Sequence, residues 1–196
     1  MNTPNKLTLG RMIATPVFMA TMLIDFPYHY LVSLIIFAAA SLTDMIDGKM
    51  ARKYNLVTDF GKFLAPLADK MLTTAAYLGF MFLYASMGKS YGIQMTAILF
   101  IVLFRDFMVS SLRLVTAKSG LVVAAYIWGK LKTVSQMVGL VTALLFYTLI
   151  KDFGLSQIQT VCDIIIMTLF WISAVLCVIS GLIYLNECKD YINSSK

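Results

Sequence analysis

The sequence has little charge and few cysteines for its length. Only 13% of its 196 residues are charged, about half the share of an ordinary soluble domain, whereas 60% are hydrophobic and the mean hydropathy is +0.82. This composition excludes a soluble globular domain. The three cysteines, Cys162, Cys177 and Cys188, have neither the paired spacing of a zinc site nor the even number of a disulfide framework. Metal–thiolate chemistry and an oxidised scaffold are therefore not expected.

Long apolar segments dominate the chain. We predict six membrane-spanning helices, at residues 9–24, 31–50, 63–87, 92–116, 126–150 and 157–185. Each segment approaches the ~20 residues that an α-helix needs to cross a bilayer, and none alternates with the period of two that a barrel strand requires. The linkers are short and no internal repeat is visible, so we expect a single all-α, polytopic membrane domain over residues 1–196.

The distribution of lysine and arginine predicts how these helices are oriented. If the N-terminus is cytoplasmic, the outer loops at 25–30, 88–91 and 151–156 contain only Lys89 and Lys151 of the 16 basic residues. Such a positive-inside bias places both termini in the cytoplasm. Orientation and contact with anionic lipid head groups then account for the net charge of +6, so nucleic acid is not an expected partner.

Acidic residues near the inner ends of the second and third spans indicate a polar cavity that faces the cytoplasm. Charged residues are costly in a membrane, so they usually face a cavity and serve a function. Asp44 and Asp47 lie three residues apart on one helical face, and Gly61, Ala65 and Asp69 recur at four-residue spacing. Carboxylates without soft ligands beside them suit Mg²⁺ or Mn²⁺, which are often bound by substrate phosphates as well.

Basic residues gather at the same predicted ends of the fourth and fifth spans, namely Arg105, Arg113, Lys130 and Lys132. Arginine in particular matches the geometry of a phosphate. For any one of these residues, the alternative is a side chain that extends to the lipid head groups and has no further role. Together with the carboxylates, they favour phosphoryl-group transfer at the membrane surface between two phosphate-containing partners.

The acidic residues also fit a known motif. The run Asp44-x-x-Asp47-Gly48-x-x-Ala51-Arg52, followed after eight residues by Gly61-x-x-x-Ala65-x-x-x-Asp69, resembles the signature of the CDP-alcohol phosphotransferase family. Every fixed position of that signature matches except Ala65, where the family has aspartate. The six predicted spans also agree with the family's fold.

Further segments are similar to bacterial family members that transfer the phosphatidyl group of CDP-diacylglycerol to sn-glycerol 3-phosphate and release CMP. These segments are Met1-Asn2-x-Pro4-Asn5-x-Leu7-Thr8-x-x-Arg11, Phe104-Arg105-Asp106-Phe107, Leu112-Arg113 and Gly129-Lys130-Leu131-Lys132-Thr133. The resemblance implies this phosphatidyltransferase activity, a multi-pass location in the bacterial inner membrane with a cytoplasmic active site, and a homodimer.

The resemblance also implies roles for individual residues. Asp44, Asp47 and Asp69 would bind two divalent ions, Mg²⁺ or Mn²⁺, and Asp69 would be the base that accepts the proton of the glycerol hydroxyl. The residues lining the CDP pocket would be Asn5, Thr8, Asp44, Gly48, Ala51, Arg52 and Gly61. Those binding the glycerol phosphate would be Arg105, Arg113, Lys130 and Lys132.

Ala65 departs from the family pattern. It removes an oxygen donor and a negative charge from the implied metal site, and Asp59, six residues earlier and off the helical stripe, is not expected to replace it. We interpret Ala65 as an engineered substitution that stops turnover, because a ligand shared by two metal ions contributes to transition-state charge stabilisation. The alternative is a natural protein without activity that binds the nucleotide-lipid or regulates a partner.

Two other functions stay open. A related family member with serine or an inositol phosphate as its acceptor would share the aspartates and differ in the acceptor pocket. An ion-coupled transporter would also place acids and bases within the membrane. A transporter, however, needs polar groups accessible from both sides, and the outer half of this chain offers little beyond Asp163.

Overall fold

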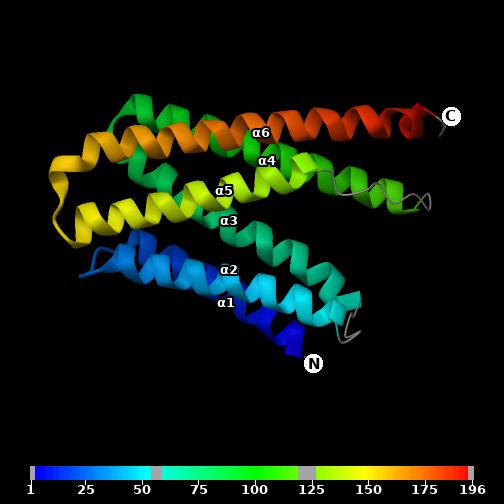
Figure 1. Cartoon of the computed structure of the whole chain (residues 1–196), viewed down its shortest axis with the longest axis horizontal. Coiled ribbons are helices and arrows are strands. Elements are labelled where there is room, and N and C mark those ends of the chain that lie inside the picture. The colour runs from blue at the N-terminus through cyan, green and yellow to red at the C-terminus, as the bar shows by residue number, and fades with distance from the viewer. Residues whose placement is uncertain (1–2, 54–58, 119–126, 194–196) are drawn as a thin grey trace. The chain divides into compact units, whose positions relative to one another are not determined.

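The computed structural model describes residues 3–53, 59–118 and 127–193 (Figure 1). The description omits the side chains of residues 3–4, 45, 47–53, 59–60, 62–63, 65, 114–118 and 189–193. The helices are α1 (Thr3–Leu23), α2 (His29–Lys53), α3 (Asp59–Met87), α4 (Lys89–Lys118), α5 (Ile127–Tyr147) and α6 (Gln159–Asn193). A π-helical turn, η1 (Thr148–Asp152), continues α5, and a 3₁₀ turn, η2 (Ser156–Ile158), precedes α6. These ranges contain no strand, which confirms the predicted all-α class.

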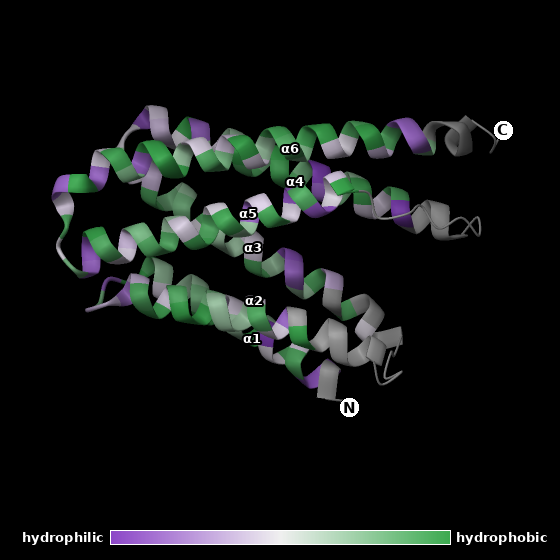
Figure 2. Ribbon diagram, viewed as in Figure 1, coloured by the Kyte–Doolittle hydropathy of each residue, from purple (hydrophilic) through white to green (hydrophobic). Residues whose placement is uncertain are grey.

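Within the part of the chain that the structure describes, three helical stretches are long and apolar enough to cross a membrane. They are Lys89–Arg113, Ile127–Asp152 and Ser156–Cys188, and His29–Asp44 is a shorter apolar stretch. Hydrophobic residues cover most of α5 and α6 (Figure 2). Large apolar side chains such as Phe100 and Ile164 remain exposed, as expected where a helix contacts lipid. The chain is therefore an all-α membrane protein, and the number of six spans stays a prediction.

The chain forms two compact units. One comprises Met1–Leu83 and Leu140–Asp163, and the other comprises Tyr84–Gly139 and Ile164–Lys196. Both α5 and α6 contribute residues to each unit, because the boundaries fall inside these helices. That the whole chain acts as one functional domain remains a prediction.

In the first unit, α1 packs along α2 (Figure 1). Phe18 of α1 and Phe37 of α2 are fully buried, and their ring centroids lie 5.7 Å apart. Gly79 of α3 approaches α1 so closely that a Cβ atom at this position would lie 2.9 Å from Cε of Met22. Glycine at this position leaves room for the side chain of Met22 between α3 and α1.

A hydrogen bond to η1 fixes the start of α2, after the loop that connects it to α1. Asp152 Oδ2 accepts a hydrogen bond from the backbone N–H of Leu31, in the first turn of α2, at 2.7 Å. In the loop between α1 and α2, Tyr28 adopts the left-handed backbone conformation, with φ of 61°. Asp152 therefore ties the first turn of α2 to the end of the α5–η1 helix.

A buried polar pair also joins α5 and α6 in this unit. The hydroxyl of Tyr147 donates to Oδ1 of Asp163 at 2.7 Å, and both residues are buried. A buried carboxylate needs such donors, because an uncompensated polar group inside a protein is costly. Asp163 therefore has a local structural role at this position.

The second unit is built from α4, the first part of α5 and most of α6. Val109 of α4 packs with Tyr184 and Cys188 of α6 in a buried cluster. Gly139 of α5 faces α6, where an added Cβ would lie 3.2 Å from Cδ1 of Phe170. These contacts fix α6 between its two neighbours in this unit. All three cysteines of the chain are buried free thiols.

Candidate active site

A buried polar stripe runs along α1. Asn5, Thr8, Arg11 and Thr15 recur at spacings of three and four residues, which place them on one helical face. All four are buried, with exposures from 2% to 7%. The hydroxyl of Thr15 donates to the backbone carbonyl of Arg11 at 3.0 Å. Two residues predicted for the CDP pocket, Asn5 and Thr8, therefore lie on the face of α1 that is turned away from solvent.

Arg11 links this stripe to the acidic motif. Its Nη1 donates to Oδ1 of Asp44 on α2, forming a salt bridge between the two helices. Arg11 is almost fully buried, whereas 39% of the Asp44 side chain is exposed. The guanidinium thus neutralises and orients a carboxylate that still reaches the surface of the unit.

The remaining residues of the acidic motif lie on α2 and α3. Asp69 is half-buried on α3, and the hydroxyl of Thr73 donates to its backbone carbonyl at 3.2 Å. Gly61 is half-buried near the start of the same helix. The other predicted residues fall within these helices, but their side chains lie outside the described residues: Asp47, Gly48, Ala51, Arg52 and Ala65.

The acidic residues suit a divalent ion in chemical kind. Asp44 and Asp69 offer carboxylate oxygens, the donors that Mg²⁺ and Mn²⁺ prefer. Among the side chains that the structure describes, no group of three acidic, histidine or cysteine residues is close enough to hold a metal ion. Asp47 is not among them, so the predicted set of three aspartates stays a prediction.

In the second unit, the structure brings together two of the four predicted phosphate-binding residues. Arg105 of α4 and Lys132 of α5 both donate to Oδ1 of Asp106, from Nη1 at 3.1 Å and from Nζ at 2.7 Å. Arg105 Nε also donates to the hydroxyl of Ser180 on α6, at 3.1 Å. The three charged side chains are 6% to 14% exposed. This group therefore connects α4, α5 and α6.

The other two predicted residues have different surroundings. Arg113 is exposed on α4, and its Cζ lies 5.8 Å from the centroid of the Tyr184 ring, a cation–π geometry. Lys130 is exposed in the first turn of α5. That all four residues bind the glycerol phosphate stays a prediction.

Sequence reasoning assigned no role to three residues that make these contacts. Arg11 and Asp106 lie in segments that the family resemblance covers, and Ser180 lies in an otherwise apolar helix. The three-residue spacing of Asn5, Thr8 and Arg11 could have identified Arg11. Nothing in the sequence around Ser180 indicates that it meets Arg105, because that contact depends on how α4 and α6 pack.

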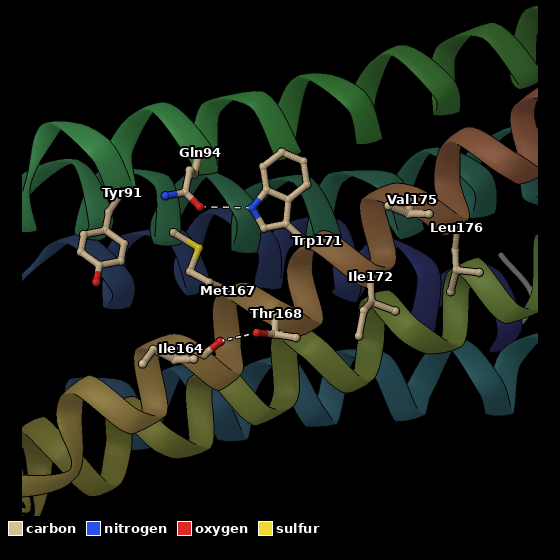
Figure 3. Close-up of a pocket in the computed structure, with 9 residues that line it drawn as sticks. All are labelled: Tyr91, Gln94, Ile164, Met167, Thr168, Trp171, Ile172, Val175 and Leu176. Atoms are coloured by element: carbon tan, nitrogen blue, oxygen red, sulfur yellow. Dashed lines mark hydrogen bonds between the residues drawn. The ribbon is translucent and has the colours of Figure 1, made fainter.

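A groove in the second unit has a different character (Figure 3). It is lined by Tyr91, Gln94, Ile164, Met167, Thr168, Trp171, Ile172, Val175 and Leu176. The indole Nε1 of Trp171 donates to Oε1 of Gln94 at 3.2 Å. Because none of the lining side chains is charged, the groove does not match the phosphate chemistry that the charged residues suggest.

The comparisons with known proteins agree with the motif. The family model described as CDP-alcohol phosphatidyltransferase matches residues 1–183. A protein of Bacillus subtilis (strain 168) is 35% identical over 209 residues, covering 99% of this chain and 98% of its own length. A protein of Rickettsia bellii is 36% identical over 190 residues, covering 97% of each chain. Both are named CDP-diacylglycerol–glycerol-3-phosphate 3-phosphatidyltransferase.

Proposed function

The chain belongs to the CDP-alcohol phosphatidyltransferase family, and from this premise we propose that it transfers the phosphatidyl group of CDP-diacylglycerol to sn-glycerol 3-phosphate. The products are phosphatidylglycerophosphate and CMP. The observation that carries the proposal is the similarity, over nearly the whole chain, to relatives named for this reaction. The chain is thus a membrane-bound transferase of phospholipid biosynthesis.

The transfer exchanges one bond to phosphorus for another. A hydroxyl oxygen of glycerol 3-phosphate forms a bond to the phosphatidyl phosphorus, and the phosphoanhydride bond to CMP breaks. CMP leaves with the electron pair of that bond. Asp69 accepts the proton of the attacking hydroxyl, a role that its half-buried position on α3 allows.

The donor is held by residues of the first unit. Asp44, Asp47 and Asp69 would hold two divalent ions, Mg²⁺ or Mn²⁺, which neutralise charge on the diphosphate and on the leaving CMP when bound. Asn5, Thr8, Asp44, Gly48, Ala51, Arg52 and Gly61 line the CDP pocket in this proposal. The salt bridge from Arg11 supports it, because it fixes the carboxylate of Asp44.

The acceptor is held by residues of the second unit. Arg105 and Lys132 bind the phosphate of glycerol 3-phosphate, and Arg113 and Lys130 add positive charge for it. Two cations and one carboxylate leave the Arg105–Lys132 group with a single net positive charge, which favours an anionic ligand. We also propose that the active site faces the cytoplasm and that the chain forms a homodimer in the bacterial inner membrane.

Ala65 makes the chain inactive or impaired in this proposal. The test is to incubate the chain and its Ala65→Asp variant in detergent with CDP-diacylglycerol, Mg²⁺ and labelled glycerol 3-phosphate. We expect CMP and labelled lipid from the Ala65→Asp variant, a much lower yield from the unchanged chain, and neither product after metal is removed with a chelator. The matched control is Leu67→Asp, which adds the same carboxylate to α3 at an exposed position and should not raise activity.

The outcomes separate the parts of the proposal. Equal turnover by the chain and its Ala65→Asp variant would contradict the interpretation of Ala65 alone. If neither forms labelled lipid, the transfer to glycerol 3-phosphate is contradicted. Competition by unlabelled serine or inositol phosphate would identify a related reaction with a different acceptor.

A further inference from the structure

The carboxylate of Asp106 holds two cationic side chains at once. Its Oδ1 accepts from Nη1 of Arg105, the preceding residue on α4, and from Nζ of Lys132 on α5. Because both donors share one oxygen atom, their heads are kept close together. Two positive charges at this distance would repel each other strongly if the carboxylate were absent, since all three side chains are largely buried.

Helix α6 helps to fix the position of Arg105 through a hydrogen bond with Ser180. The hydroxyl of Ser180 accepts from Nε of Arg105 and donates to the backbone carbonyl of Cys177 at 3.0 Å. With its proton committed to Cys177, the hydroxyl presents a lone pair to Arg105. Arg105 is therefore held on two sides of its guanidinium, by Asp106 and by Ser180.

Gly181 allows the stem of Arg105 to lie against α6. A Cβ atom at Gly181 would lie 3.2 Å from Cγ of Arg105 and 3.2 Å from Cε of Met108. Such a distance is shorter than ordinary van der Waals contact between carbon atoms. A methyl group at this position would therefore require the stem of Arg105 or the end of Met108 to shift by a few tenths of an ångström.

This arrangement reduces what phosphate binding would cost. Fixing a flexible side chain on binding weakens affinity by about twofold to tenfold for each side chain, and a side chain that is already held avoids that loss. Arginine and lysine both have long, flexible stems. Arg105 and Lys132 are ordered before any ligand arrives, because each donates to Asp106.

Resting on the proposed function, we propose that Asp106 is a positioning residue that holds Arg105 and Lys132 as a preformed clamp for the acceptor's phosphate. Ser180 and Gly181 complete the clamp from α6. Asp106 acts only through the two cations and does not contact the substrate. A purely structural role, in which Asp106 merely ties α4 to α5, would instead lower stability and affect both substrates alike.

The test measures kcat and the two KM values separately in the full-length Ala65→Asp protein. We expect Ser180→Ala to raise the KM for glycerol 3-phosphate by about threefold to tenfold, with the KM for CDP-diacylglycerol unchanged. Asp106→Asn should raise the same KM by tenfold or more, and Asp106→Glu should restore most of the loss because it keeps the charge. Ser180→Ala also covers the case in which Asp106→Asn fails to fold.

A matched pair of glycine variants tests the contact between Arg105 and α6. Gly181→Ala should raise the KM for glycerol 3-phosphate, since the new methyl group meets Arg105. Gly139→Ala places a methyl group equally close to a neighbour, 3.2 Å from Phe170, but away from the cations. It should leave that KM unchanged.

Binding to the unchanged chain gives a readout that does not need turnover. Calorimetric titration with glycerol 3-phosphate should show weaker binding for Ser180→Ala than for the parent. If the Ala65→Asp protein turns over substrate but the Ser180 and Asp106 variants made in it change both KM values or neither, the clamp is wrong and the proposed function stands. If the Ala65→Asp protein neither binds glycerol 3-phosphate nor forms labelled lipid, the proposed function fails and the clamp fails with it.

Discussion

Arg11 is a charged residue in an almost fully buried position, with only 2% of the residue exposed. A buried cation needs a counter-ion, because removing its partner leaves an uncompensated charge away from water. Asp44 meets that need across the α1–α2 contact. Arg11 therefore affects both the packing of α1 on α2 and the direction in which the Asp44 carboxylate points.

We predict that Arg11→Gln lowers the free energy of unfolding by about 1–2 kcal/mol, since it removes a charged hydrogen bond to a partly exposed carboxylate. In the Ala65→Asp protein it should also lower activity, because Asp44 loses its orientation. Thermal unfolding in detergent and product formation check the two effects. The control is Lys6→Gln, which removes an exposed cation from the same helix. Equal losses in both variants would show that the salt bridge has no special effect.

At this scale, the sequence predicted the kinds of residue better than their contacts. Aspartates at helical spacing identified the acidic motif, whereas Asn5 and Thr8 were assigned to the CDP pocket by the resemblance to the family. Asp106 was visible as one more charge beside Arg105, but its pairing with Lys132 depends on the packing of α4 against α5. A contact between residues 26 positions apart in sequence follows from tertiary structure, and no local pattern encodes it.

Among the elements, α2 shows how one helix end depends on a distant segment. The first backbone N–H groups of an α-helix have no partner within the helix, and the positive end of the helix dipole favours a carboxylate there. Asp152 of η1 provides that carboxylate to Leu31. The start of α2 is therefore stabilised by a residue 121 positions away in sequence.

We predict that Asp152→Ala lowers the free energy of unfolding by about 1 kcal/mol, the usual effect of losing a cap at a helix N-terminus. Amide hydrogen exchange at the first turn of α2 should become faster. The control is Asp25→Ala, in the loop between α1 and α2, whose side chain is fully exposed and lies 3.8 Å from His29. If Asp25→Ala has an equal effect, the loss reflects the charge of the loop and not the cap.

Helix positions were predictable and helix ends were not. The predicted span at 9–24 overlaps α1 (Thr3–Leu23), and the predicted span at 157–185 overlaps α6 (Gln159–Asn193). The helices extend into polar residues, because backbone hydrogen bonding continues past the apolar part. The π-helical turn at Thr148–Asp152 has no hydropathy signal at all.

For the whole molecule, the main expectation is its orientation in the membrane. We predict that Asp25→Cys reacts with a membrane-impermeant maleimide in intact cells, because the loop after α1 is expected outside. Lys6→Cys, on the cytoplasmic side, should react only after the cells are permeabilised. Both native side chains are exposed, and the three native cysteines are buried, so the background should be low. The opposite labelling pattern would contradict the positive-inside assignment.

At this largest scale, sequence reasoning recovered the family and the membrane class but not the division of the chain. The acidic motif lies in one compact unit, and the Arg105–Lys132 group lies in the other. Hydropathy and motif spacing are properties of single helices. They do not indicate that α5 and α6 each contribute to both units.

The pairing of Arg105 with Asp106 has a further consequence for biosynthesis. These two residues are neighbours on α4 and already neutralise each other there, whereas Lys132 arrives only with α5. A single charge at the centre of a bilayer costs about 2.5–3.5 kcal/mol during insertion from the translocon. As the nascent chain emerges from the ribosome, the Arg105–Asp106 pair can thus lower the cost of placing α4 in lipid, before the helix that carries Lys132 has been synthesised.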